Sequence, residues 1–157
     1  MSSKSLLNKE FMILALEEAT LAMSEGEIPV GAVIVRDGQV IARAHNEREK
    51  GKNPLYHAEI LAIDRASKHL DSWRLEDCDL YVTLEPCIMC ISACIQSRIR
   101  NIYFGAYDEK GGAVCSIANI PDIPRLSHRV FCRGGIMEEE CSKLLRDFFK
   151  NLRNKEI

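Results

Sequence analysis

Four side chains in two short motifs have the types and spacing of a metal site. His57 and Glu59 stand two residues apart, and Cys87 and Cys90 follow within the run Pro86-Cys87-Ile88-Met89-Cys90. One imidazole and two thiolates suit zinc, and cysteines three residues apart on a helix share one face, within reach of a single ion. We therefore expect His57, Cys87 and Cys90 to bind zinc.

The two motifs supply three zinc ligands and no fourth. Structural zinc sites are closed by four protein ligands, whereas catalytic sites hold three and leave one position to water or substrate. Zinc lowers the pKa of such a water to about 7, and Glu59 is well placed to carry its proton. The combination H-x-E with P-C-x-x-C is the signature of zinc deaminases. The alternative is a closed structural site with Cys115 or His128 as fourth ligand.

The elements around these motifs predict an α/β fold with a mixed sheet. Asp37-Gly38 indicates a hairpin of antiparallel strands, and the strand–helix–strand order around Cys87 indicates parallel ones. Helical periods begin near Asn8, His57, Cys87 and Met137, and strands are expected at 31–35, 40–42, 80–83, 101–105 and near 129–132. Residues 107–128 have little periodicity and are expected to form a long functional loop.

The composition is that of an ordinary globular protein, with 46% hydrophobic and 28% charged residues in a chain of 157. This length suffices for one core, so we expect a single domain over residues 1–157. No apolar run approaches the ~20 residues that span a bilayer. The start, Met1 to Ser5, lacks the apolar centre of a signal peptide, and we expect a cytoplasmic protein without a membrane partner.

The net charge of -2 excludes the strongly basic field that non-specific nucleic-acid binders use. An RNA partner would therefore need a local basic patch. Lys143, Arg146, Lys150 and Arg153 follow steps of three and four residues and form one stripe on the last expected helix. A solvated outer face is the alternative meaning of this pattern.

Further motifs extend over nearly the whole chain. They are Glu27–Val33, Asn46, Tyr56–Ile60, Leu80–Cys90, Ser97–Ile99, Phe104–Ala106 with Asp108, and Asp147–Phe149. In these segments the chain resembles the bacterial tRNA-specific adenosine deaminases, of the zinc-dependent cytidine and deoxycytidylate deaminase superfamily. The resemblance implies a three-layer αβα deaminase-like fold with a central mixed five-stranded sheet. It also implies hydrolytic conversion of adenosine to inosine at the wobble position of a tRNA anticodon, by a homodimer with one zinc per subunit.

The resemblance also implies roles for single residues. His57, Cys87 and Cys90 match the zinc ligands of the family, and Glu59 matches its proton shuttle. Asn46 matches a residue that hydrogen-bonds the target base, although an Asn just after a strand also structures turns.

Three further positions match the substrate pocket of the family. Ile28 and Leu84 match apolar walls of the base pocket, with a core role as the alternative. Asp108 matches a contact with the flipped anticodon loop, with a solvated turn as the alternative. The chain departs from the family pattern at Tyr107 and Ser127, where Arg and Asn are common. A tyrosine can still stack on a splayed base.

Two other functions remain open from the sequence. A deaminase of a free base or nucleoside, such as guanine or cytosine or cytidine, would use the same metal signature. A non-catalytic RNA-binding module with structural zinc would retain RNA affinity without releasing ammonia.

Overall fold

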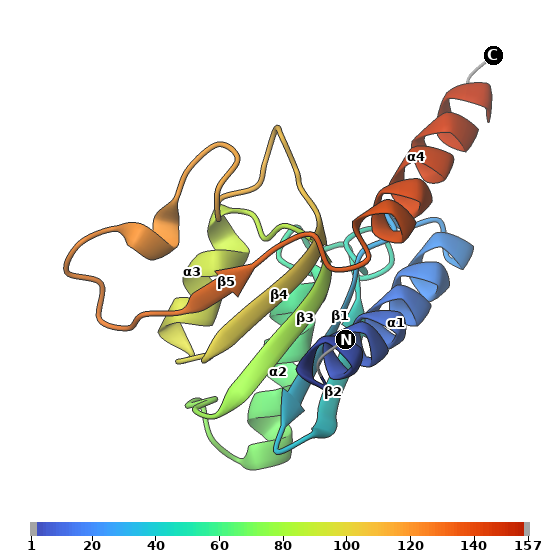
Figure 1. Cartoon of the computed structure of the whole chain (residues 1–157). Helices are drawn as coiled ribbons and strands as arrows, with labels where there is room; N and C mark the ends of the chain where they lie inside the picture. Colours follow the sequence, from blue (N-terminus) through green and yellow to red (C-terminus); the bar gives the residue numbers. More distant parts are fainter. Residues whose placement is uncertain (1–2, 156–157) are drawn as a thin grey trace.

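A five-stranded mixed sheet forms the centre of the computed structural model, which describes residues 3–155 and the side chains from Asn8 onward (Figure 1). The spatial order is β2-β1-β3-β4-β5. The strands are β1 (Gly31–Arg36), β2 (Gln39–His45), β3 (Cys78–Leu84), β4 (Asn101–Ala106) and β5 (Phe131–Arg133). Strand β1 pairs antiparallel with β2 and β3, whereas β3, β4 and β5 are parallel. The expected mixed sheet is confirmed.

Helices cover both faces of this sheet. Helices α1 (Ser3–Ser24) and α4 (Glu138–Lys155) lie on one face, and α2 (Ala58–Leu70) and α3 (Ile88–Gln96) lie on the other (Figure 1). Alternation along the strands sends Ile34 and Val82 into the core beneath α2 and α3, and Val33 and Tyr81 into the core beneath α1 and α4. The result is the expected three-layer αβα arrangement.

The Asp37-Gly38 turn has the backbone that its sequence predicts. Both residues have positive φ, 51° and 75°, as a two-residue hairpin turn of type I′ requires. At the other end of β1, Gly31 lies directly against α1, where a Cβ atom would come within 2.0 Å of the Ala15 carbonyl oxygen. Glycine at this position therefore lets α1 pack close to the sheet.

The segment between β4 and β5 is a loop with one short 3-10 turn, η1 (Ile120–Asp122). Strand β5 begins at Phe131, two residues later than the sequence suggests. The Arg129 guanidinium instead donates to the carbonyl oxygens of Pro121 and Ile123, at 3.0 and 2.7 Å, and so belongs to the loop.

The ends of the expected domain, residues 1–2 and 156–157, lie outside the described residues. Among the helices of the described part, none combines the length and apolar character needed to cross a bilayer.

Candidate metal centre and active site

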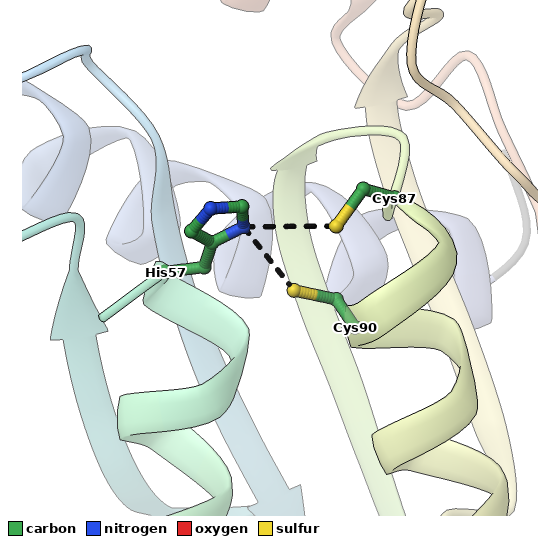
Figure 2. A group of neighbouring side chains, drawn as sticks. All are labelled: His57, Cys87 and Cys90. Atoms are coloured by element: carbon green, nitrogen blue, oxygen red, sulfur yellow. Dashed lines mark hydrogen bonds between the residues drawn. The ribbon is translucent and has the colours of Figure 1, made fainter. Parts of the chain in front are cut away.

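The expected metal ligands meet where two helices begin. His57 and Cys87 immediately precede α2 and α3, and Cys90 lies in the first turn of α3. Figure 2 shows the three side chains pointing toward one another, with His57 Nδ1 3.7 Å from Cys87 Sγ and 3.5 Å from Cys90 Sγ. Tetrahedral zinc with ordinary bond lengths places its nitrogen and sulfur ligands roughly 3.6 Å apart. The donor set and its spacing therefore fit one zinc ion.

The cluster does not include either candidate for a fourth protein ligand. Within the described residues, two groups of donor atoms lie within 4.8 Å of one another, and the group at the two helix starts contains only His57, Cys87 and Cys90. The exposed Cys115 lies on the loop after β4, where its backbone N–H donates to Glu85. The His128 ring contacts the Ile99 carbonyl oxygen at 2.7 Å. The geometry thus contradicts a closed site made with Cys115 or His128.

Contacts among the ligands favour the charged forms of Cys87 and His57 and the neutral form of Cys90. A hydrogen bond from the Cys90 thiol lowers the pKa of Cys87 to about 4, although burial opposes the shift. The same contact, together with burial, raises the pKa of Cys90. The hydrogen bond with Cys87 raises the pKa of His57. The lowered pKa of Cys87 favours the thiolate, the form of cysteine that binds metal.

Glu59 lies beside the ligands and faces the same cavity as His57. It is in the first turn of α2 and only 4% exposed. Burial raises the pKa of Glu59 to about 7. A carboxyl group that titrates near neutral pH can both accept and release a proton, as general acid–base catalysis requires.

A cavity of about 170 Å³ opens in front of these groups and gathers nearly all of the predicted site residues. Its lining includes Ile28, Asn46, His57, Glu59, Leu84, Cys87 and Asp108. Cys90, the remaining predicted site residue, is fully buried behind it. Asn46 is 7% exposed and also structures its loop, because its Oδ1 accepts a hydrogen bond from the Arg48 backbone N–H at 3.3 Å.

Sequence reasoning missed a buried carboxylate that anchors one loop of the cavity. Glu85, 1% exposed, accepts hydrogen bonds from the Ser116 hydroxyl and from four backbone N–H groups, those of Asp108, Val114, Cys115 and Ser116. Burial opposes the ionisation of Glu85, but these hydrogen bonds outweigh it and lower its pKa. A Cβ atom at Gly112 would lie 2.2 Å from the Glu85 carboxyl carbon, so glycine is needed there.

A second buried carboxylate anchors the loop on the other side of the cavity. Glu27, 1% exposed, accepts the backbone N–H groups of Glu49 and Lys50 at 3.0 and 2.7 Å. The signal for both residues was present in the sequence. Each acid is next to an apolar residue and within two residues of a proline, in Glu27-Ile28-Pro29 and Leu84-Glu85-Pro86. Arg48, which also lines the cavity, carried no such signal.

Known deaminases match this chain over most of its length. The model of the MafB19-like deaminase family matches residues 7–153. The tRNA-specific adenosine deaminase of Aquifex aeolicus is 50% identical over 152 residues, which cover 96% of this chain and 100% of the relative. The tRNA-specific adenosine deaminase of Bacillus subtilis is 47% identical over 145 residues, which cover 92% of this chain and 90% of the relative.

A solved structure of a related protein has the same fold as this chain. It comes from biochemical and structural studies of A-to-I editing by tRNA:A34 deaminases at the wobble position of transfer RNA. It is 45% identical to this chain, has a TM-score of 0.84, and matches 87% of this chain and 99% of its own. The chain therefore belongs to the tRNA-specific adenosine deaminase family, as its motifs indicate.

Proposed function

We propose that this protein hydrolytically deaminates adenosine to inosine at the wobble position of a tRNA anticodon. The observation that carries the proposal is a single cavity that holds the metal-ligand cluster and the buried carboxylate Glu59 together with the predicted base contacts. His57, Cys87 and Cys90 would hold one zinc per subunit. Zinc held by three protein ligands supplies an activated water, whose pKa it lowers to about 7.

The chain's own residues position the base and move protons. Ile28 and Leu84 form apolar walls for a flat purine, and the Asn46 amide hydrogen-bonds the edge of the base. The Glu59 carboxylate accepts a proton and delivers protons to a ring nitrogen and to the amine that leaves C6. Asp108 lies at the loop side of the cavity, where the backbone of the flipped nucleotide enters. An unpaired anticodon loop lowers the cost of extruding the base.

The RNA would be held by a local basic surface, in keeping with the net charge of -2. Helix α4 extends beyond the sheet (Figure 1), and Arg146, Lys150 and Arg153 line a groove there together with Phe149. Lys143 and Arg146 are partly neutralised by Asp147 and Glu139. We assign phosphate contacts to Lys150 and Arg153 on this helix.

We infer that the protein acts in the cytoplasm, where tRNA is modified, as a homodimer of single-domain subunits spanning residues 1–157. One continuous sheet with a core on each face supports the single domain. Two apolar side chains close in sequence to the metal ligands, Leu55 and Ile88, are each 53% exposed. Their exposure supports a dimer interface at this surface. Light scattering should give the mass of two chains.

The first test of the proposed function is deamination of a synthetic anticodon stem-loop that carries a wobble adenosine. Free adenosine, cytidine, cytosine and guanine are assayed in parallel. We expect inosine in the stem-loop and no turnover of the free compounds. Turnover of a free base or nucleoside with an inert stem-loop would show that the chemistry is right and the substrate wrong. RNA binding without ammonia release would indicate a binding module.

Glu85→Gln should lower kcat/KM on the stem-loop by roughly 10- to 100-fold, because misplacement of a substrate-positioning loop costs about that much. The amide keeps the size of the side chain but replaces one acceptor oxygen with an N–H₂ donor. Whichever way it is turned, that donor faces a backbone N–H donor, of Asp108 or of residues 114–116. Zinc content should stay at the wild-type value. Hydrogen exchange of the amides of residues 108–116 should accelerate.

The matched control for Glu85→Gln is Glu76→Gln, at a glutamate whose side chain is 63% exposed. It should match the wild type in kinetics and hydrogen exchange. Unchanged exchange and kinetics in Glu85→Gln would contradict the anchoring role.

A further inference from the structure

A second cleft, of about 410 Å³, adjoins the active-site cavity. The two share a wall at the end of β4, where consecutive residues line different hollows. Asp108 lines the cavity with the metal ligands, and Tyr107 lines the second cleft. A hydrogen bond also links the two hollows. Glu85, which lines the active-site cavity, accepts the backbone N–H of Cys115, which lines the second cleft. The second cleft therefore has a rigid side that it shares with the active site.

Two exposed aromatic rings dominate this second cleft. Tyr107 is 44% exposed and Phe131, the first residue of β5, is 61% exposed. The Tyr107 ring packs edge-on against the buried Phe104, with ring centroids 5.1 Å apart and planes at 85°. A Cβ atom at Gly134 would lie 2.4 Å from Phe104 and 2.8 Å from the Tyr107 hydroxyl, so glycine makes room for this arrangement. The Tyr107 ring is thus fixed by packing on one side and exposed to solvent on the other.

Beside the two rings, the cleft is lined by apolar residues such as Val114 and Val130 and by two polar residues, and no lysine or arginine is among the described residues that line it. Asn119 and Asp122 line it from the loop after β4, and the Asn119 amide donates to Asp122 at 2.8 Å. Aromatic surfaces with an amide and a carboxylate nearby suit a nucleobase, which offers a π face and hydrogen-bonding edges. They do not suit a phosphate group, which needs cationic partners.

We propose that this second cleft receives the nucleobase adjacent to the target adenosine in the same RNA strand, stacked on Tyr107 or Phe131. The proposal rests on the proposed function. Tyr107 and Asp108 are consecutive residues with Cα atoms about 3.8 Å apart, and each lines one of the two hollows. Neighbouring bases of one strand can therefore reach both. The cleft then reads the base that flanks the edited position.

The test uses the full protein with Tyr107→Ala and Phe131→Ala, and three stem-loops: one intact, and one abasic at each neighbour of the wobble adenosine. On the intact stem-loop we expect kcat/KM to fall by about 5- to 150-fold in at least one variant, the range that stacking of one base implies. On the abasic stem-loop that lacks the stacked base, wild type and that variant should be equally slow. Tyr107→Phe should retain most activity.

Two comparisons separate stacking from other roles. Trp73→Ala removes a ring that is 57% exposed beyond the far end of α2, about 20 Å along the helix from His57, and should change nothing. The salt dependence of RNA binding should keep its slope in Tyr107→Ala and lose steepness in Lys150→Ala, because only the latter removes a phosphate partner. The intact stem-loop should also protect the exposed Cys115 thiol in the cleft from a neutral alkylating reagent.

Each outcome has one meaning. A wild-type protein that is inert on the intact stem-loop would overturn the proposed function and this inference with it. An active wild type with unaffected Tyr107→Ala and Phe131→Ala variants would overturn the cleft assignment alone. Equal losses on the intact and both abasic stem-loops would assign the rings a structural role and overturn it too. A change in molar mass on Phe131→Ala would mean that a second copy of the chain covers the cleft instead.

Discussion

Glu59→Gln is expected to reduce the single-turnover rate of inosine formation by about 10²- to 10⁴-fold, the usual contribution of a general acid–base group. Glutamine keeps the size of the side chain in a site that is only 4% exposed, but it cannot accept a proton. Glu59 is not among the clustered ligand atoms, so the variant should still bind one zinc per chain. The two measurements are the rate on the stem-loop and the ratio of zinc to protein.

A matched control for this change is Glu18→Gln. Glu18 is likewise buried, at 8% exposed, but it lies on α1 and pairs with Arg43 and His45, away from the cavity. We expect Glu18→Gln to edit the stem-loop at a rate close to that of the wild type. A Glu59→Gln variant with activity within tenfold of the wild type would show that another group carries the proton. Loss of zinc together with activity would assign Glu59 to the metal site.

The grouping of His57, Cys87 and Cys90 could be predicted from the sequence because most of its geometry is local. Cys87 and Cys90 are separated by one helical turn, and helix geometry alone places their side chains on one face. His57 and Cys87 both occupy the position just before a helix. A prediction of where the two helices start therefore also places these two residues at the helix N-termini. Only the approach of α2 and α3 to each other required the fold.

The loops around the cavity could not be predicted in the same way. Their paths depend on hydrogen bonds between distant residues, such as those of Glu85 with residues 114–116 and of Glu27 with residues 49–50. No periodicity marks such contacts. The sequence predicts a loop over 107–128, but it did not indicate that Phe131 and Tyr107 would line one cleft.

The start of β5 illustrates the same limit at a strand boundary. Arg129 and Val130 have the composition of a strand, but the Arg129 side chain is held by two carbonyl oxygens of the preceding loop. A tertiary contact of this kind overrides local preference. Where a side chain contacts a distant loop, the strand boundary is therefore set by tertiary structure and not by the local sequence.

Cys87→Ala should lower the zinc content from about one ion per chain to near zero and abolish editing of the stem-loop. The variant leaves one thiol and one imidazole, and three protein ligands are the usual minimum of a catalytic zinc site. Zinc binding also stabilises the folded state, since it favours the state that holds the ion. A strong chelator should therefore lower the Tm of the wild type and leave the Tm of Cys87→Ala unchanged.

Cys78→Ala supplies the matched control, because it makes the same chemical change at a buried cysteine in the first position of β3, at the opposite end of that strand from Leu84. It should keep its zinc, its editing activity and its response to the chelator. Full zinc in Cys87→Ala would refute the ligand assignment of this residue. Zinc loss in both variants would mean that a weakened fold releases the ion. Loss confined to Cys87→Ala, with a Tm like that of the chelated wild type, leaves direct ligation as the cause.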